Sequence, residues 1–202
     1  DKANCRMSFL GMESLNEESL RGVQKKQNKV EEYKEYFDKL NRKGILTFTG
    51  LMFALDEDTK EYYETLPEKL DEVGCNVILP SISIPLYGTP LYQKIKSEGR
   101  LIDENITHYE GDHVLFKHNN LTEEEIYEAY RRVNKIFYSW KNIFRRWIKF
   151  IRKQSVQESI PQFVLKVLIS TIIYFKLSIF QKHHAEERVF HKNLSASKTK
   201  LS

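Results

Sequence analysis

The chain contains few cysteines and lacks the motifs of several large protein classes. Cys5 and Cys75 are the only cysteines among 202 residues, and they lie 70 positions apart. This spacing provides neither a disulfide framework nor the closely spaced thiolates that an iron–sulfur site needs. The sequence contains no Gly-rich phosphate loop or Walker motif, and no signal-peptide pattern opens it. We therefore expect a cytoplasmic protein rather than a secreted one.

Long uncharged apolar runs are also missing. Residues 160–180 are strongly apolar, but Lys166 and Lys176 interrupt them, and the longest uncharged run, residues 167–175, has nine residues. A membrane-spanning helix needs about 20 apolar residues. We therefore expect a packed or interfacial helix in this region.

The histidines do not have the spacing of metal ligands. Neither the group near residues 108–118 nor the group near residues 183–191 contains HxxxH or HExxH, the spacings that place two ligands on one helical face. We therefore expect no metal site held by this chain.

Positive charge is concentrated in one segment. The formal net charge is +4, but residues 131–153 contain nine Lys or Arg residues and no Asp or Glu. Aromatic residues are interleaved with these charges, which suits an anionic lipid surface or nucleic acid. We favour an amphipathic helix that packs its aromatic face on the domain and leaves its basic face in solvent. On this interpretation no nucleic-acid partner is expected, and peripheral membrane contact is kept as an alternative.

The first half of the chain alternates predicted strands with predicted helices. A content of 41% hydrophobic and 12% aromatic residues excludes a disordered chain. Apolar runs predict strands at residues 6–11, 45–55 and 76–84, and amphipathic helices lie between them. We expect Gly44 to end the first helix, and Asp58 with Glu61 to cap the second. This alternation is typical of a parallel sheet, here about half of a barrel.

The stretch Ile84–Tyr92 predicts a tight turn that opens a helix. Pro85 fixes φ, Gly88 permits a positive φ, and Thr89 followed by proline is typical of an N-cap and the first helical residue. We expect a helix from Pro90 to about Glu98 that stops at Gly99. Because ligands of parallel α/β proteins bind beyond the carboxyl ends of strands, this turn marks a candidate site. Beyond a polar loop at residues 101–120, Thr122 and Glu125 should cap one long helix whose apolar face reaches Trp140.

Four segments in this order resemble a known family. They are Gly11–Ser14 with Lys25–Asn28, Leu51–Thr59, Ile84–Tyr92 with Glu98–Arg100, and His108–His113 ahead of Leu121–Glu125. Together they are similar to the late-barrel motifs of radical S-adenosylmethionine (SAM) enzymes, in particular the subfamily with an N-terminal cobalamin-binding domain. The resemblance covers residues 6–150. It implies an α/β fold, with the C-terminal half of a radical SAM partial TIM barrel in residues 1–100, a mostly α-helical region in residues 101–182 and a polar tail in residues 183–202.

The resemblance also implies cofactors and a missing partner. The family uses SAM and a four-iron four-sulfur cluster, and this subfamily adds cobalamin. The CxxxCxxC motif that holds the cluster does not occur here. We therefore expect the C-terminal part of a larger enzyme, inactive alone, whose missing N-terminal part holds the cluster. The parent would carry out radical methyl transfer or rearrangement on an unidentified small-molecule or lipid-like substrate. A non-catalytic remnant and a basic helical module that binds a membrane surface or nucleic acid are the alternatives.

Five residues of the predicted SAM pocket follow from the same resemblance. Glu13 and Ser14 would contact the cofactor ribose, Lys25 would pair with its carboxylate, the backbone of Ile84 would bond the adenine ring, and Asp56 would shape the adjoining turn. From the residues alone, Glu13 and Ser14 are equally suited to cap the next helix, and Lys25 to be a solvated surface charge.

Two further residues of these motifs carry expectations. Ala54 replaces a glycine of the family at a close backbone approach, so its methyl group would narrow the pocket. Arg100 could pair with a carboxylate at the same edge of the sheet, but an arginine at a surface helix end is the commoner case. The sequence identifies no catalytic residue.

Overall fold

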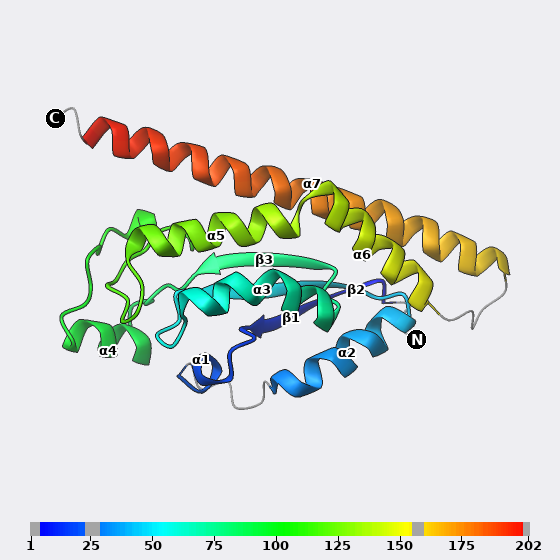
Figure 1. The fold of residues 1–202 in the computed structure, drawn as a ribbon, viewed down its shortest axis with the longest axis horizontal. Helices are drawn as coiled ribbons and strands as arrows, with labels where there is room; N and C mark the ends of the chain where they lie inside the picture. Colours follow the sequence, from blue (N-terminus) through cyan, green and yellow to red (C-terminus); the bar gives the residue numbers. More distant parts are fainter. Residues whose placement is uncertain (1–4, 23–28, 155–159, 200–202) are drawn as a thin grey trace.

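The protein consists of a three-stranded parallel sheet and seven α-helices in the residues described (Figure 1). The structure is a computed structural model, and it describes residues 5–22, 29–154 and 160–199. The elements in chain order are β1 (Met7–Glu13), α1 (Glu17–Gly22), α2 (Val30–Arg42), β2 (Leu46–Phe53), α3 (Lys60–Val73), β3 (Val77–Ile82), α4 (Pro90–Ser97), a 3₁₀ turn (Ile106–His108), α5 (Glu123–Phe137), α6 (Trp140–Lys153) and α7 (Ile160–Thr199).

The sheet has the order β1-β2-β3, and both pairs of neighbours are parallel. Phe9 pairs with Phe48, and Phe48 pairs with Val77. The predicted strands, their parallel pairing and their consecutive order are therefore confirmed. In the part of the chain that the structure describes, these strands form an open sheet, and closure into a barrel is not confirmed.

The two faces of the sheet differ in burial. Along β2, buried residues alternate with half-buried ones, because successive side chains of a strand point to opposite faces. Phe53 belongs to the buried set, and its ring packs on Tyr63 of α3 and Tyr130 of α5. The other face, which we call the open face, is half-buried or exposed and carries Met7, Phe9, Gly11, Phe48, Gly50, Met52, Leu79 and Ser81. Phe9 is 60% exposed there, although parallel sheets are normally covered on both faces.

The helix boundaries follow local signals, with one correction. Thr89 caps α4 by accepting a hydrogen bond from the Tyr92 N–H, and Gly99 has φ +66°, as the turn chemistry predicts. The predicted capping box of Thr122 with Glu125 is present at α5. At α3, however, the N-cap is Thr59 and not Asp58. Asp58 is fully buried and bonds other partners instead.

The predicted long helix after residue 122 is divided into α5 and α6. Tyr138 leaves the helical conformation, and Ser139 is extended, with φ −63° and ψ 142°. The division coincides with a contact that the helical periodicity does not reveal: the Tyr138 hydroxyl donates to the Ile78 carbonyl (2.5 Å) and accepts from the Ile78 N–H (3.0 Å). The basic segment at residues 131–153 therefore spans two helices.

The same contact belongs to a set that closes the free edge of β3. Besides Ile78, the Pro80 carbonyl accepts from the Tyr130 hydroxyl (3.4 Å), and the Ile82 N–H donates to the Gly111 carbonyl (2.7 Å). Pro80 itself has no N–H to donate, which suits an edge strand. Unpaired edge groups are the sites at which further strands add. The sheet therefore ends at β3 and has room for another strand only beside β1.

Helix α7 lies along α5 and α6 on the outside of the domain (Figure 1). It continues to Thr199, so residues beyond 182 are helical, whereas the sequence pattern predicted a loose tail. No glycine or proline occurs between Gln162 and Thr199 to end the helix. By length and composition, the segment Ile160–His183 could cross a membrane, with a mean hydropathy of 1.9.

We predict that Tyr138→Phe destabilises the protein by about 2 kcal/mol, because it leaves a buried N–H and a buried carbonyl without their partner. Urea unfolding followed by circular dichroism measures the change. Tyr36→Phe is the matched control, since that hydroxyl bonds only Glu32 on the surface. Equal stability of the two variants would contradict a structural role for the edge contact.

Candidate functional site

The carboxyl ends of the three strands form one edge of the sheet, which we call the rim. It consists of residues 13–14, 54–56 and 83–85. The register aligns the three ends, since Glu13 pairs with Leu51 and Phe53 pairs with Ile82. The predicted site residues Glu13, Asp56 and Ile84 therefore lie at one edge, as parallel pairing requires. Lys25 lies outside the described residues.

Glu13 lies where β1 leaves its regular register. A register shift separates Gly11 from Glu13, and Glu13 has φ +66°, the left-handed region that favours glycine. A Cβ atom added to Gly11 would be 2.8 Å from Oε1 of Glu13. The carboxylate therefore folds back over Gly11. Asn16, and not Glu13, caps the following helix, because its Oδ1 accepts from the Glu18 N–H (3.0 Å).

Ser14 turns into the protein. It is fully buried, its hydroxyl is 3.0 Å from that of Tyr62, and it accepts from the Asn16 N–H (3.0 Å). Burial raises the pKa of the Tyr62 hydroxyl, so this group stays protonated. Ser14 thus anchors the chain immediately after Glu13, and the N–H from which it accepts is that of the cap residue Asn16 and not one of the first turn of α1.

Asp56 forms the ionic centre of the rim. Its Oδ1 is 2.5 Å from Nη2 of Arg100 and its Oδ2 is 2.6 Å from Nζ of Lys94. Burial opposes ionisation of Asp56, but its hydrogen bonds to Arg100 and Lys94 and their charges outweigh that effect, so its pKa is lowered. Of the two alternatives for Arg100, the structure shows the pairing with a carboxylate at this edge, which is the less common one. Asp56 therefore joins the end of β2 to the end of α4.

Ala54 is the second strained residue of the rim. Its φ is +61°, and the only positive-φ residues other than glycine in the described part of the chain are Glu13 and Ala54. The Ala54 N–H donates to the Tyr63 hydroxyl (2.7 Å), which in turn donates to Oδ2 of Asp58 (2.6 Å). The position at which the resemblance leads one to expect glycine is thus one where the backbone requires left-handed geometry, and alanine occupies it under strain.

Asp58 was not predicted as part of this region, although it holds the loop after β2. Its carboxylate accepts from the Ser19 hydroxyl (2.7 Å), the Tyr63 hydroxyl and the Leu55 N–H (3.0 Å). Burial raises the pKa of Asp58, and the three donors oppose that rise. His118 supports the same loop by donating from Nε2 to the Leu55 carbonyl (2.7 Å). Only the short spacing of Asp56 and Asp58 after a buried strand could have indicated this arrangement.

Ile84 lies beneath the loop at residues 101–120. Its carbonyl accepts from the Leu86 N–H (3.0 Å), which forms the predicted tight turn. Gly111 approaches closely, since a Cβ there would be 3.6 Å from Cδ1 of Ile84 and 2.3 Å from Oγ of Ser81. The loop therefore covers the third strand end and leaves the first one, at Glu13, at the uncovered side of the sheet.

Metal ligands do not converge among the described residues. His108 bonds Asp103 (2.6 Å), His113 bonds Asp112 (2.7 Å), and the two imidazole rings stack with centroids 4.6 Å apart. Within residues 5–22, 29–154 and 160–199 no group of three or more His, Cys, Asp or Glu residues could hold a metal ion. Cys75 is buried just before β3, at the end of the sheet away from the rim, and burial raises the pKa of its thiol to about 12.

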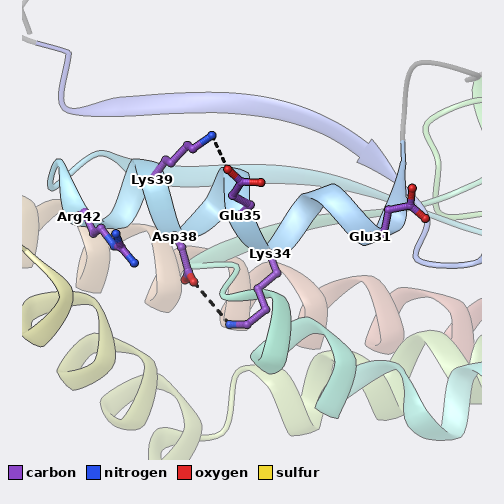
Figure 2. A pocket seen from close by; sticks show the side chains of 6 residues that line it. All are labelled: Glu31, Lys34, Glu35, Asp38, Lys39 and Arg42. Carbon is purple, nitrogen blue, oxygen red and sulfur yellow. Dashed lines mark hydrogen bonds and ion pairs between the residues drawn. The ribbon is translucent and has the colours of Figure 1, made fainter.

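A surface hollow along α2 is a charged helix face and not a site. Figure 2 shows its six lining side chains, all from α2. Lys39 pairs with Glu35 (2.6 Å) and Lys34 with Asp38 (3.5 Å), which are i,i+4 ion pairs of an exposed helix. Four of the six lining side chains are thus paired with one another along α2, as on an ordinary charged helix surface.

We predict that Asp56→Asn costs about 1–3 kcal/mol of stability at pH 7, because it removes charged hydrogen bonds. The folded-state pKa of Asp56 is lowered. The stabilisation is therefore present above the unfolded-state pKa of about 4 and is lost as the pH falls through the folded-state value. Urea unfolding of both proteins at pH 7 and at pH values below 4 measures the difference in their free energies of unfolding, which should become smaller at low pH. Glu57→Gln, an exposed neighbour, should show little difference at neutral pH, and a pH-independent cost of Asp56→Asn would contradict the assignment.

We also predict that Ala54→Gly leaves stability within about 0.5 kcal/mol of the original or raises it, because relief of left-handed strain offsets the greater backbone entropy of glycine. Ala129→Gly in α5 provides the contrast and should cost about 1 kcal/mol. Urea unfolding compares the two. A larger cost at residue 54 than at residue 129 would show that Ala54 is not strained.

Comparison of the sequence with known proteins identifies a family and two relatives. The model of a domain of unknown function, DUF4070, matches residues 89–195. The chain is 22% identical over 157 residues to bacteriochlorophyllide d C-12(1)-methyltransferase of Chlorobaculum tepidum, covering 74% of this chain and 34% of that protein. It is 26% identical over 97 residues to hopanoid C-2 methylase of Rhodopseudomonas palustris, covering 48% of this chain and 18% of that protein.

Both relatives are cobalamin-type radical SAM enzymes, and the chain spans only a minor part of the length of each. The match to the family model covers more than half of the chain. The chain therefore belongs to the DUF4070 family, a domain found in cobalamin-binding radical SAM enzymes.

Proposed function

We propose that this chain is the C-terminal part of a cobalamin-dependent radical SAM methyltransferase and supplies one wall of its SAM pocket. The observation that carries the proposal is the Glu13 carboxylate, folded over Gly11 at the carboxyl end of the edge strand. A carboxylate there is suited to accept hydrogen bonds from the two ribose hydroxyls of SAM. The backbone of Ile84 and the side chain of Lys25 would contact the adenine ring and the methionyl carboxylate.

Backbone strain supports the choice of this edge. Glu13 and Ala54 end neighbouring strands, and both hold left-handed conformations that cost about 1–3 kcal/mol each. Such strain persists only where surrounding contacts enforce it, and it concentrates at ligand sites. Ser14 and Asp58 supply those contacts through Tyr62 and Tyr63. Their proposed role is to position Glu13 and the end of β2, and not to touch SAM.

The cluster does not fit the residues described here, because Cys5 and Cys75 lie apart and Cys75 is buried far from the rim. Its ligands would come from the missing N-terminal part of the enzyme. When bound, the cluster and SAM supply radical chemistry and cobalamin carries a methyl group. This chain's own contribution is to hold SAM, to orient it and to exclude water.

The sheet indicates where the missing part would attach. The edge of β3 is closed by Tyr130, Tyr138 and Gly111, so further strands would pair with β1. Added strands would also curve over the open face and cover Phe9. That arrangement would place Glu13 inside the barrel mouth rather than at its outer edge.

The substrate remains a small molecule or a lipid-like compound of unknown identity. A second candidate function is a non-catalytic remnant or a basic helical module, which the charge of α6 favours. Nucleic acid suits α6 poorly as a partner, because Arg145 and Lys149 pair with Asp71 and Lys153 pairs with Asp38. An upstream reading frame that encodes CxxxCxxC and a cobalamin-binding domain would decide for the enzyme.

We predict that Glu13→Gln in the full-length protein weakens SAM binding by about 10- to 100-fold, the value of a hydrogen bond to a charged group. Gly11→Ala should act in the same direction, because its methyl group would displace the Glu13 carboxylate. Isothermal titration calorimetry with SAM measures affinity, and thermal unfolding measures stability.

Glu57→Gln is the control, since Glu57 is an exposed carboxylate next to the rim. Its SAM affinity should equal that of the unmodified protein. Unchanged affinity in Glu13→Gln together with a large loss of thermal stability would identify Glu13 as a structural residue and reject the proposed pocket.

A further inference from the structure

Helix α7 has its polarity reversed relative to a helix of a soluble protein. Its five buried side chains within residues 160–183 are those of Tyr174 and of the polar residues Lys166, Ser170, Ser178 and Gln181, each of the four at most 8% exposed, while Ile173, Phe175 and Leu177 are half-buried against the core. Its outward side chains are apolar and between 37% and 58% exposed at Leu165, Leu168, Ile169, Ile172 and Ile179, with Phe180 at 61%. A helix facing water shows the opposite arrangement.

The neighbouring helix continues the same surface. Trp140, Phe144 and Ile148 of α6 are 49%, 48% and 40% exposed. The Phe144 ring lies 5.4 Å from that of Phe175, so the two helices present one surface, which we call the outer apolar face. It consists of Trp140, Phe144, Ile148, Leu165, Leu168, Ile169, Ile172, Ile179 and Phe180. Contiguous apolar patches of this extent mark interaction sites on soluble proteins.

The charged residues of α6 and of residues 160–183 of α7 are all positive. In α6, Arg146 is buried and Arg145, Lys149 and Lys153 pair with Asp71 and Asp38, whereas Lys141 and Arg152 are exposed. The α7 segment contributes Lys166, which is buried, and also Lys176 and Lys182. Lys176 lies within the apolar face, and Nζ of Lys182 lies 4.8 Å from the centre of the Trp140 ring. Apolar side chains ringed by Lys, Arg and Trp match the interface of an anionic bilayer. A symmetric pair of copies would instead bring positive charge against positive charge.

The contacts of α7 with the domain favour a helix that lies flat. The Tyr174 hydroxyl donates to the Ile143 carbonyl (2.9 Å), and the Trp147 Nε1–H donates to the Thr171 hydroxyl (3.1 Å). Crossing the membrane would break both contacts and move Lys166, Ser170 and Gln181 into lipid, which is costly. In Figure 1 the helix runs along α5 and α6 over the domain surface.

We propose that the outer apolar face docks on the surface of an anionic lipid bilayer, with α7 parallel to the membrane plane. The apolar side chains enter the headgroup and acyl boundary, and Lys141, Arg152, Lys176 and Lys182 contact lipid phosphates. The proposal does not depend on the reaction that the rim supports, and a loss of membrane binding would leave the SAM pocket untested.

The first experiment is co-sedimentation of the full-length protein with vesicles of phosphatidylcholine containing about 30% phosphatidylglycerol. We expect binding that weakens in pure phosphatidylcholine and at about 0.5 M salt. The variant Leu168→Gln/Ile172→Gln/Phe180→Gln should bind at least about tenfold more weakly. Lys176→Glu should weaken binding by about fivefold or more.

The matched control is Ile102→Gln/Ile106→Gln, which changes two exposed isoleucines outside the outer apolar face. Its vesicle binding should equal that of the unmodified protein. A second measurement does not depend on the triple variant. Brominated lipids should quench the tryptophan fluorescence of the unmodified protein, and this quenching should be lost in Trp140→Phe. Failure of the unmodified protein to bind anionic vesicles, or no quenching at Trp140, would overturn the proposal. A dimer that the triple variant dissociates would identify a second copy as the occupant and would also overturn it.

Discussion

The closed edge of β3 is the constraint on which the remaining structure depends. Backbone groups on that edge need partners, and the Tyr138 hydroxyl satisfies both polar groups of Ile78. Pro80 has no N–H that would need a partner, and the Gly111 carbonyl accepts from the Ile82 N–H. To make its contact, Tyr138 must leave the helix, and α6 then starts in a new direction. Its cations thereby reach Asp38 and Asp71 at the other end of the sheet.

The closed edge also makes the two sides of the sheet different. The backbone groups on the β3 edge have partners. On the opposite side β1 is an edge strand, and its Phe9 is exposed on the open face. The chain spans 34% of the length of one curated relative and 18% of the length of another. In the proposed function further strands would therefore add at the β1 edge and over the open face, because the β3 side is occupied by α5 and the loop that contains Gly111.

The rim is held by a network that enforces unfavourable backbone geometry. The Ala54 N–H, Tyr63 and Asp58 form a chain of hydrogen bonds, and Ser19 joins it from α1. Burial makes the loss of any of these hydrogen bonds costly, so the network holds Ala54 in its left-handed conformation. The Asp56 ion pairs tie the rim to α4 independently. The proposed pocket wall is therefore held in its conformation by contacts within this chain.

Local signals in the sequence determined the strands, their parallel connection, and the caps at Thr89 and Thr122, because each depends on residues within one element or its crossover. The resemblance placed Glu13, Asp56 and Ile84 at strand ends, and the register brought those ends together. The sequence pattern could not show that Asp58 is buried, that Tyr138 divides a helix, or that α7 turns Lys166 and Ser170 inward. These features depend on contacts between residues 5 to 60 positions apart, and periodicity identifies an apolar face without identifying what covers it. The tertiary structure alone decided which face of α7 meets the domain, because that choice depends on the contacts of Tyr174 with Ile143 and of Trp147 with Thr171, which join residues far apart in the chain.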